Sequence, residues 1–294
     1  MPLFKRCDGT LLKDIPLFRK LNPYLMRSRT ESTIFIPFHV DVTKTLKYLE
    51  DLQERRGEKV SIFNIILAAS ARTFALRPKL NRFCNGTHLY QRNEICFSFI
   101  AKKQLHDEAK ETNVKMRFSP YVTLFDVIAQ VHAELHEARK DDGYYQDEEV
   151  NKFGKLPGFM IRFLTSAFRF LDKHNLAPKS MIKTDPLFCS QYITNMGSVG
   201  MKLGPHHHLF EWGNASLFLA ISQHTKRPRV NEDGEVVVKD VLDMIVTWDD
   251  RIADGLYGQK SAELLKDFIE NPRQLEEPPE IPQKTLDKLM LKDY

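Results

Sequence analysis

Two short stretches of the sequence carry side chains that could do chemistry. The first holds three consecutive histidines, His206, His207 and His208, each able to supply an imidazole base or a metal ligand. Neighbouring residues on a strand point to opposite faces, so three in a row rarely converge on one ion, and the pattern favours loop histidines without a metal. The second stretch, residues 247–272, runs from a strand through an acidic turn into an amphipathic helix.

The acidic turn, taken alone, indicates a helix cap. Asp254 stands at the N-terminal end of the expected helix, where a carboxylate accepts backbone N–H bonds and meets the helix dipole favourably. The sequence has no Gly-rich phosphate loop, no G-x-S-x-G elbow and no H-E-x-x-H motif. An assignment of chemistry therefore needs the elements around both stretches.

Hydrophobic periodicity predicts a mixture of helices and strands. Strands are expected over residues 34–42, 113–118, 187–197, 215–223 and 236–248, and two more, joined by a turn at residues 92–93, between 88 and 103. Helices are expected over 43–57, 61–76, 158–174 and 256–270, and another after Ser119-Pro120. Because the elements do not alternate strictly, the predicted fold class is α+β (mixed α/β). We predict that helix 158–174 lies over a core, with contact to a membrane surface or a partner as the alternative.

Composition places further bounds on the protein. We expect a single domain over residues 1–294, with an extended tail, docked or mobile, over 276–294. The net charge of +4 is spread along the chain and does not call for a nucleic-acid partner. No apolar run is long enough to span a membrane, and the N-terminus lacks the apolar core of a secretory signal. Four cysteines without a C-x-x-C pair suit reduced thiols, so a cytoplasmic location is expected.

The acidic turn reads DDRIADG at residues 249–255, and it resembles a known signature. Dihydrolipoyl acyltransferase catalytic domains of 2-oxo acid dehydrogenase complexes, and their relative chloramphenicol acetyltransferase, carry His-x-x-x-Asp-Gly there, commonly written DHRxxDG. The likeness continues upstream in the family's order, through FRKLNPYLMRSR, VDVTKTL, FALRPKLNRF, residues 93–101 and the (S/T)NxG-like ITNMGSVG. It covers residues 15–272 apart from 154–185. It implies a chloramphenicol acetyltransferase-like fold, a mixed sheet flanked by helices.

The resemblance also implies roles for particular residues. In that family a signature histidine is the general base that deprotonates the acceptor, which then attacks the acyl-CoA thioester, and a Ser or Thr hydroxyl stabilises the oxyanion. Thr194 matches that hydroxyl and Asn195 follows it. Asp254 and Gly255 match the last two signature positions, and the family's aspartate supports the site through an arginine. Arg251 is the arginine of the signature itself.

The signature histidine is replaced in this sequence by Asp250. An aspartate with an ordinary pKa near ~3.9 is a weaker base than a histidine near ~6.5. Most of the roughly 10²–10⁴-fold that general-base catalysis supplies would then be lost, unless burial beside other carboxylates raises that pKa. Alternatively, one of the three histidines at 206–208 could supply the imidazole, within one chain or across a subunit boundary, because they follow the (S/T)NxG segment.

Two functions therefore stay open. The first is a homotrimeric enzyme in which acyl-CoA and a thiol or hydroxyl acceptor enter opposite ends of a channel between subunits, with Asp250, Thr194 and Asp254 as catalytic residues. The second is a non-catalytic trimeric scaffold or CoA-binding pseudoenzyme of the same fold. No lipoyl or subunit-binding domain is expected in the chain, so the acceptor would be a free small molecule or a lipoyl group on another chain. Higher assembly of the trimers stays open, and neither function requires a metal.

Overall fold

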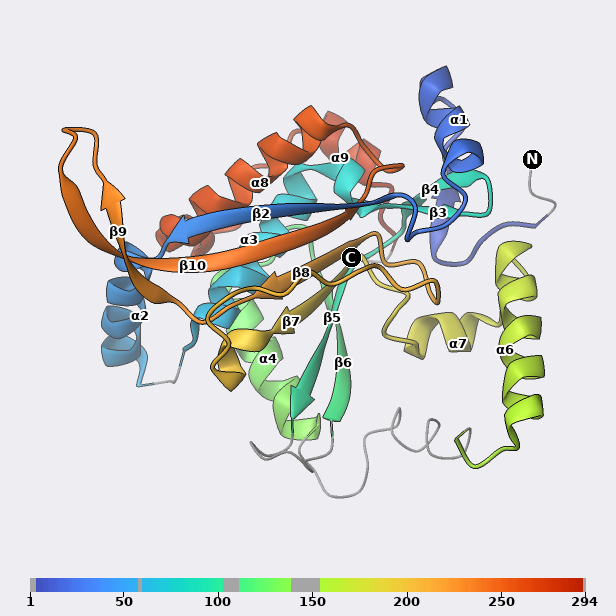
Figure 1. Cartoon of the computed structure of the whole chain (residues 1–294), viewed down its shortest axis with the longest axis horizontal. Helices are drawn as coiled ribbons and strands as arrows, with labels where there is room; N and C mark the ends of the chain where they lie inside the picture. Colours follow the sequence, from blue (N-terminus) through green and yellow to red (C-terminus); the bar gives the residue numbers. More distant parts are fainter. Residues whose placement is uncertain (1–3, 58–59, 103–110, 139–153, 293–294) are drawn as a thin grey trace.

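The computed structural model describes residues 4–57, 60–102, 111–138 and 154–292. Within these ranges a seven-stranded sheet runs through the centre of the molecule (Figure 1). Its strands are β2 (Thr33–Asp41), β5 (Ile95–Lys102), β6 (Glu111–Phe118), β7 (Gln191–Asn195), β8 (Leu217–Ile221), β9 (Thr225–Val230) and β10 (Val236–Asp249). The order is β2-β10-β8-β7-β5-β6, with β9 paired to the first part of β10. Strand β7 runs parallel to β5 and β8, and the other pairs are antiparallel, so the sheet is mixed as predicted.

One face of this sheet is covered by helices. Helices α3 (Ile62–Leu76), α4 (Leu124–Ala138) and α8 (Gly255–Glu270) pack over it. Helix α3 is apolar almost all round and correspondingly buried, and a capping box between Ser61 and Asn64 fixes its start. Strand residues at alternate positions, such as Ile193, Leu219 and Val246, meet these helices in one hydrophobic core. The opposite face of the sheet is not covered by these three helices and carries a separate hydrophobic cluster that includes Tyr192, Leu209 and Phe218.

Smaller elements surround the sheet. A second sheet has the order β1-β4-β3, from β1 (Gly9–Leu11), β4 (His88–Arg92) and β3 (Arg82–Asn85). The remaining helices of the described chain are α1 (Leu17–Leu25), α2 (Thr43–Arg56), α6 (Gly158–Lys173), α7 (Lys179–Thr184) and α9 (Gln283–Leu289), with short 3₁₀ turns at Pro78–Asn81, Met196–Val199 and Pro272–Leu275. None of the helices in the described ranges is long and apolar enough to cross a membrane.

Most of the expected elements are present, and four expectations are corrected. Helix α4 begins at Leu124, where Thr123 and Asp126 bond each other, rather than directly after Ser119-Pro120. The two strands between 88 and 103 belong to different sheets. The C-terminal tail is not simply extended, because it contains α9, which packs beside α3 and buries Leu289 completely.

The fourth correction concerns helix α6, which does not lie over the main core and reaches only a small cluster with Ile182 and Phe188. Phe168 is its buried residue, whereas Phe159 and Phe163 are 75% and 70% exposed. Figure 1 shows α6 at one end of the molecule, apart from the large sheet. The apolar face of α6 is therefore mostly uncovered by the residues that the structure describes.

Candidate active site

The candidate residues gather on the sheet face that α3, α4 and α8 leave open. Tyr192 of β7, Phe218 of β8 and Thr247 of β10 are neighbours in the pairing register. Residues paired across a sheet share a face, and residues two apart on one strand do too, so Thr194 lies on the same face as these three. Tyr192 and Phe218 belong to a cluster separate from the main core, which confirms that this is the other side of the sheet.

Thr194 stands at the end of β7, where a tight turn begins. Its hydroxyl donates to the Sδ atom of Met196 at 3.3 Å, and a thioether is a weak acceptor. The Asn195 side chain accepts from the backbone N–H of Ser198 at 3.2 Å and caps the 3₁₀ turn that follows. A Cβ at Gly197 would overlap the carbonyl of Ser222, so only glycine fits there. The turn therefore positions a hydroxyl without tying it to a strong partner.

The start of the signature turn is held by a buried ion pair. Asp249 is completely buried, and Arg251 donates to its two carboxylate oxygens at 2.8 and 2.7 Å. A third bond runs from Arg251 to the carbonyl of Met26 at 3.1 Å. Burial opposes the charge of Arg251, but the hydrogen bonds and the charge of Asp249 outweigh it and raise the pKa of Arg251. Both partners are thus committed to holding the turn.

The end of the same turn forms the start of α8. Asp254 accepts from the backbone N–H of Tyr257 at 2.9 Å, which lowers its pKa, and Gly255 is the first helical residue. Its ion-pair partner is Lys79, at 3.6 Å, instead of the arginine that the resemblance implies. Asp254 therefore acts in this chain as the helix cap that its sequence position indicates.

Asp250 lies at the rim of the sheet. Its backbone N–H donates to Ser32 at 2.9 Å, and its carbonyl accepts from Arg19 at 2.7 Å. Its half-buried side chain makes no hydrogen bond within the part of the chain that the structure describes. Register places Thr194 level with Ile245 of β10, five residues before Asp250, a separation of about 16 Å along the strand. One protomer therefore does not bring Thr194 and Asp250 together.

Of the three histidines, His207 is the one held in a defined state. Its ring lies flat on Phe218, with centroids 3.9 Å apart and an interplanar angle of 2°. Its Nδ1 donates to the carbonyl of His208 at 2.7 Å, which leaves Nε2 as the nitrogen with the lone pair. Burial lowers the pKa of His207, so the ring is neutral near pH 7. His206, which meets the edge of Phe35, and His208 are exposed.

The geometry thus brings His207 and Thr194 to one place. Phe218, on which the imidazole rests, is level with Tyr192, and Thr194 is two residues further along β7. That offset is about 7 Å along the strand, enough to admit reacting atoms between the two side chains. The hydroxyl of Thr247 donates to the His207 carbonyl and fixes the loop to the sheet. Within the described residues, no group of three or more potential ligands could hold a metal ion.

Sequence reasoning missed two features of this region. Arg19 enters the resemblance only within the segment FRKLNPYLMRSR, yet its side chain donates to the Asp250 carbonyl. On β2 and β10, His39 and Asp243 meet at 2.5 Å, and Arg227 donates to both Asp243 oxygens. The basic pattern FRKLN was a usable signal for Arg19. His39 and Asp243 are 204 positions apart, and only the sheet register joins them.

Comparison with known proteins confirms the resemblance and the fold. Residues 189–276 match the family model of the 2-oxoacid dehydrogenases acyltransferase (catalytic domain), a segment that contains Thr194, His207 and the signature turn. A probable dihydrolipoamide acetyltransferase from Listeria monocytogenes 4b F2365 has a TM-score of 0.57 and 15% identity, over 88% of this chain and 95% of that one. The dihydrolipoamide acetyltransferase of Azotobacter vinelandii has a TM-score of 0.58 and 13% identity, over 90% of this chain and 93% of that one.

A chloramphenicol acetyltransferase gives a TM-score of 0.55 at 12% identity, over 89% of this chain and 99% of that one. No curated protein matches the sequence. The three structures share the fold of this chain, which is therefore the chloramphenicol acetyltransferase-like fold.

Proposed function

We propose that this chain is an acyltransferase, which moves an acyl group from acyl-CoA to a thiol or hydroxyl acceptor. The observation that carries the proposal is the placement of Thr194 and His207 over the same sheet face, opposite α3, α4 and α8, with an offset of about 7 Å along the strand. A hydroxyl held by a weak acceptor and an imidazole fixed in its Nε2-basic tautomer are the two groups that such a reaction needs. In this scheme His207 takes the place of the histidine missing from the signature.

The reaction then follows from ordinary acyl-transfer chemistry. His207 Nε2 takes the proton of the acceptor as its sulfur or oxygen attacks the thioester carbonyl carbon. The carbonyl oxygen becomes an oxyanion, and the Thr194 hydroxyl turns from Met196 Sδ to donate to it. The tetrahedral intermediate collapses, the carbon–sulfur bond to CoA breaks, and the leaving thiolate takes the proton back from the imidazolium. Proton and acyl group are both accounted for.

The signature turn has a supporting role in this proposal. Arg251 with Asp249 and the Asp254 cap hold the turn in place. Because Asp250 is about 16 Å from Thr194 along its own strand, it would reach a site only in another copy. We propose a homotrimer with a channel between copies. The apolar side chains that α1 leaves uncovered, Leu17 at 74% and Phe18 at 67% exposed, support such contacts.

The test is a transfer assay with acetyl-CoA and dihydrolipoamide or a small alcohol. His207→Asn should lower kcat/KM by about 10²–10⁴-fold, because it removes the base. His206→Asn is the matched control, since it changes an exposed histidine whose ring meets Phe35, and it should leave the rate unchanged. Because the pKa of His207 is lowered, the wild-type rate should hold to below pH 6.5 before it falls with protonation of the ring. A His207→Asn variant as active as wild type would refute the assignment.

The second candidate is a trimeric CoA-binding scaffold without activity. The aspartate at position 250, where the signature has a histidine, is the observation that favours it. Calorimetric titration with CoA and acetyl-CoA separates the two candidates when it is combined with the assay. Binding without turnover in wild type, and transfer that appears in Asp250→His, would identify the scaffold.

A further inference from the structure

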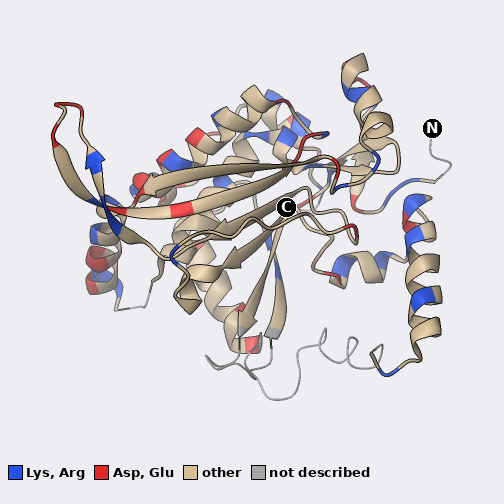
Figure 2. Ribbon diagram, in the orientation of Figure 1, with Lys and Arg blue, Asp and Glu red and all other residues tan. Residues whose placement is uncertain are grey.

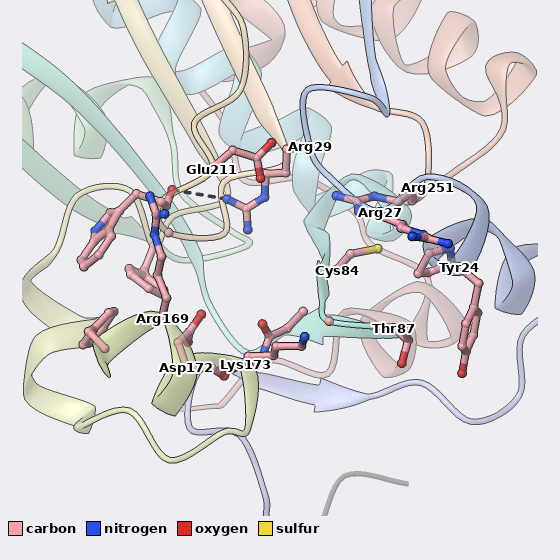
Figure 3. A pocket seen from close by; sticks show the side chains of 17 residues that line it. Tyr24, Arg27, Arg29, Cys84, Thr87, Arg169, Asp172, Lys173, Glu211 and Arg251 are labelled. Atoms are coloured by element: carbon pink, nitrogen blue, oxygen red, sulfur yellow. Dashed lines mark hydrogen bonds between the residues drawn. The ribbon is translucent and has the colours of Figure 1, made fainter. Parts of the chain in front are cut away.

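A cavity of about 720 Å³ lies beside Arg251 of the signature turn, and neither Thr194 nor His207 lines it (Figure 3). Four parts of the chain enclose it: α6, the connection from α1 to β2, the turn between β3 and β4, and the loop before β8. We call it the basic cavity. Its α6 wall lies in the stretch 154–185, which the acyltransferase resemblance does not cover.

Positive charge exceeds negative charge around the basic cavity. The cations that line it are Arg27, Arg29, Arg169, Lys173 and Arg251, and the carboxylates are Asp172 and Glu211. One cation and one carboxylate are already neutralised, Arg251 by Asp249 and Asp172 by Arg6 at 2.9 Å. Four cations then face a single remaining carboxylate. Figure 2 shows that basic residues recur along α6.

Among the lining cations, Arg29 is the one whose charge is energetically most unfavourable, because it is buried. Its side chain is buried, with 8% of the residue accessible, yet it makes no ion pair with any residue that the structure describes. Its hydrogen bonds, to the carbonyls of Phe210 at 2.9 Å and Trp212 at 3.3 Å, all come from Nη1. Burial lowers the pKa of Arg29 to about 10. Asp249 and Glu211 lie close enough to offset part of this cost of burial, but neither forms an ion pair with Arg29 in the described chain. A buried charge without a direct ion-pair partner is unfavourable, so a bound anion would stabilise it.

We infer that the basic cavity binds a phosphate-bearing small molecule, with its phosphate on Arg29. Guanidinium groups match phosphate oxygens in charge and in their forked donors. A carboxylate would offset one of the surplus charges, whereas a phosphate dianion offsets two. The volume lies in the range of small-molecule sites, and the rings of Tyr24 and Trp212 give the organic part of the ligand apolar walls. This site goes beyond the proposed acyl transfer.

The experiment is calorimetric titration of the full chain with inorganic phosphate and with pyrophosphate, against chloride at matched ionic strength. Wild type should bind both, and pyrophosphate more tightly. Arg29→Met should weaken binding at least tenfold, because it removes the buried guanidinium. Arg169→Gln with Lys173→Gln changes two exposed residues, so it should fold and still weaken binding several-fold. Arg162→Gln, on the same helix but outside the cavity, is the control and should bind as wild type does.

Titration with CoA distinguishes two sources of the phosphate. If Arg29→Met abolishes binding of CoA as well as of phosphate, the cavity holds phosphates of the acyl donor. If CoA binding and transfer persist while phosphate binding is lost, the ligand is a separate organic phosphate. The inference is overturned if wild type binds neither anion above the chloride control, or if the α6 double variant binds as tightly as Arg162→Gln. These readouts need no acyl transfer, so they stand apart from the proposed function.

Discussion

Residues 189–276 contain two turns, one at the end of β7 and the signature turn at 249–255, and their polar side chains are held differently. At the end of β7, the Thr194 hydroxyl has a thioether as its partner, a bond that is easily exchanged. In the signature turn, Asp249 and Arg251 are locked to each other, and Asp254 is locked to the start of α8. The first turn leaves the Thr194 hydroxyl with a partner that it can exchange. In the second turn, the charged side chains are held in structural contacts.

This difference bears on the signature-like turn, in which Asp250 stands where the resemblance expects a histidine. Asp249, Arg251 and Asp254 remain because the turn and α8 depend on them, whatever Asp250 does. Under the proposed function, the chemistry instead depends on the sheet face opposite α3, α4 and α8, where His207 rests on Phe218. The comparison predicts that substitutions in the signature turn lower stability, whereas substitution of Thr194 at the end of β7 lowers the reaction rate.

The largest effect should come from the buried ion pair. Arg251→Met leaves Asp249 as a buried, unpaired charge and should lower the free energy of unfolding by about 3–5 kcal/mol. Urea denaturation followed by circular dichroism measures it. Lys79→Met removes the exposed pair with Asp254 and should cost less than about 1 kcal/mol. Equal losses in the two variants would contradict the structural role of the first pair.

The next effect should be on rate. Thr194→Val keeps the shape of the side chain and removes the hydroxyl, so kcat should fall by about 10²–10³-fold, the usual loss of one oxyanion donor. Its stability should stay close to wild type, because the lost bond runs to a thioether. Steady-state kinetics beside a melting curve separates the two effects. An unchanged kcat would remove Thr194 from the reacting centre and break the comparison.

How much of this could be read from the sequence depends on how local each signal is. Hydrophobic period was enough for α3 and for a strand that carries Thr194, since adjacent residues determine each of them, and the resemblance implied the mixed sheet. The turn at Met196–Val199 was not predicted, because the strand was expected to continue to residue 197. The state of His207 was not accessible, because it depends on a ring 11 positions away that β8 places beneath it. Helix α6 was predicted to lie over a core, yet it buries only Phe168, in a small cluster, because an amphipathic pattern shows that a helix has an apolar face and not what covers that face.

A smaller effect on stability is expected at Gly197. Gly197→Ala puts a methyl group against the Ser222 carbonyl, a backbone atom that cannot swing away. Overpacking of this kind costs typically about 1–3 kcal/mol, and the strain should also move the Thr194 hydroxyl and lower kcat. Gly255→Ala is the matched control, since its methyl group would meet no atom within 4 Å. Chemical denaturation of both variants should separate them; equal stability would contradict the tight packing of the first turn.

The smallest effect should be at Asp254, and its pH dependence distinguishes a cap from a catalyst. The Tyr257 N–H lowers the pKa of Asp254, so its stabilisation is present above the unfolded value of about 3.9 and is lost as the pH falls through the lowered folded value. Asp254→Ala should cost about 1 kcal/mol at pH 7, and its deficit should shrink in acid. Asp254→Asn keeps an amide cap without the charge, so it should stay near wild type at pH 7 and lose the pH dependence. Urea midpoints at pH 7 and pH 3 test this. If Asp254→Asn instead lost acyl transfer at full stability, the carboxylate would take part in the reaction. The signature turn would then not be purely structural, in contrast to the comparison of the two turns above.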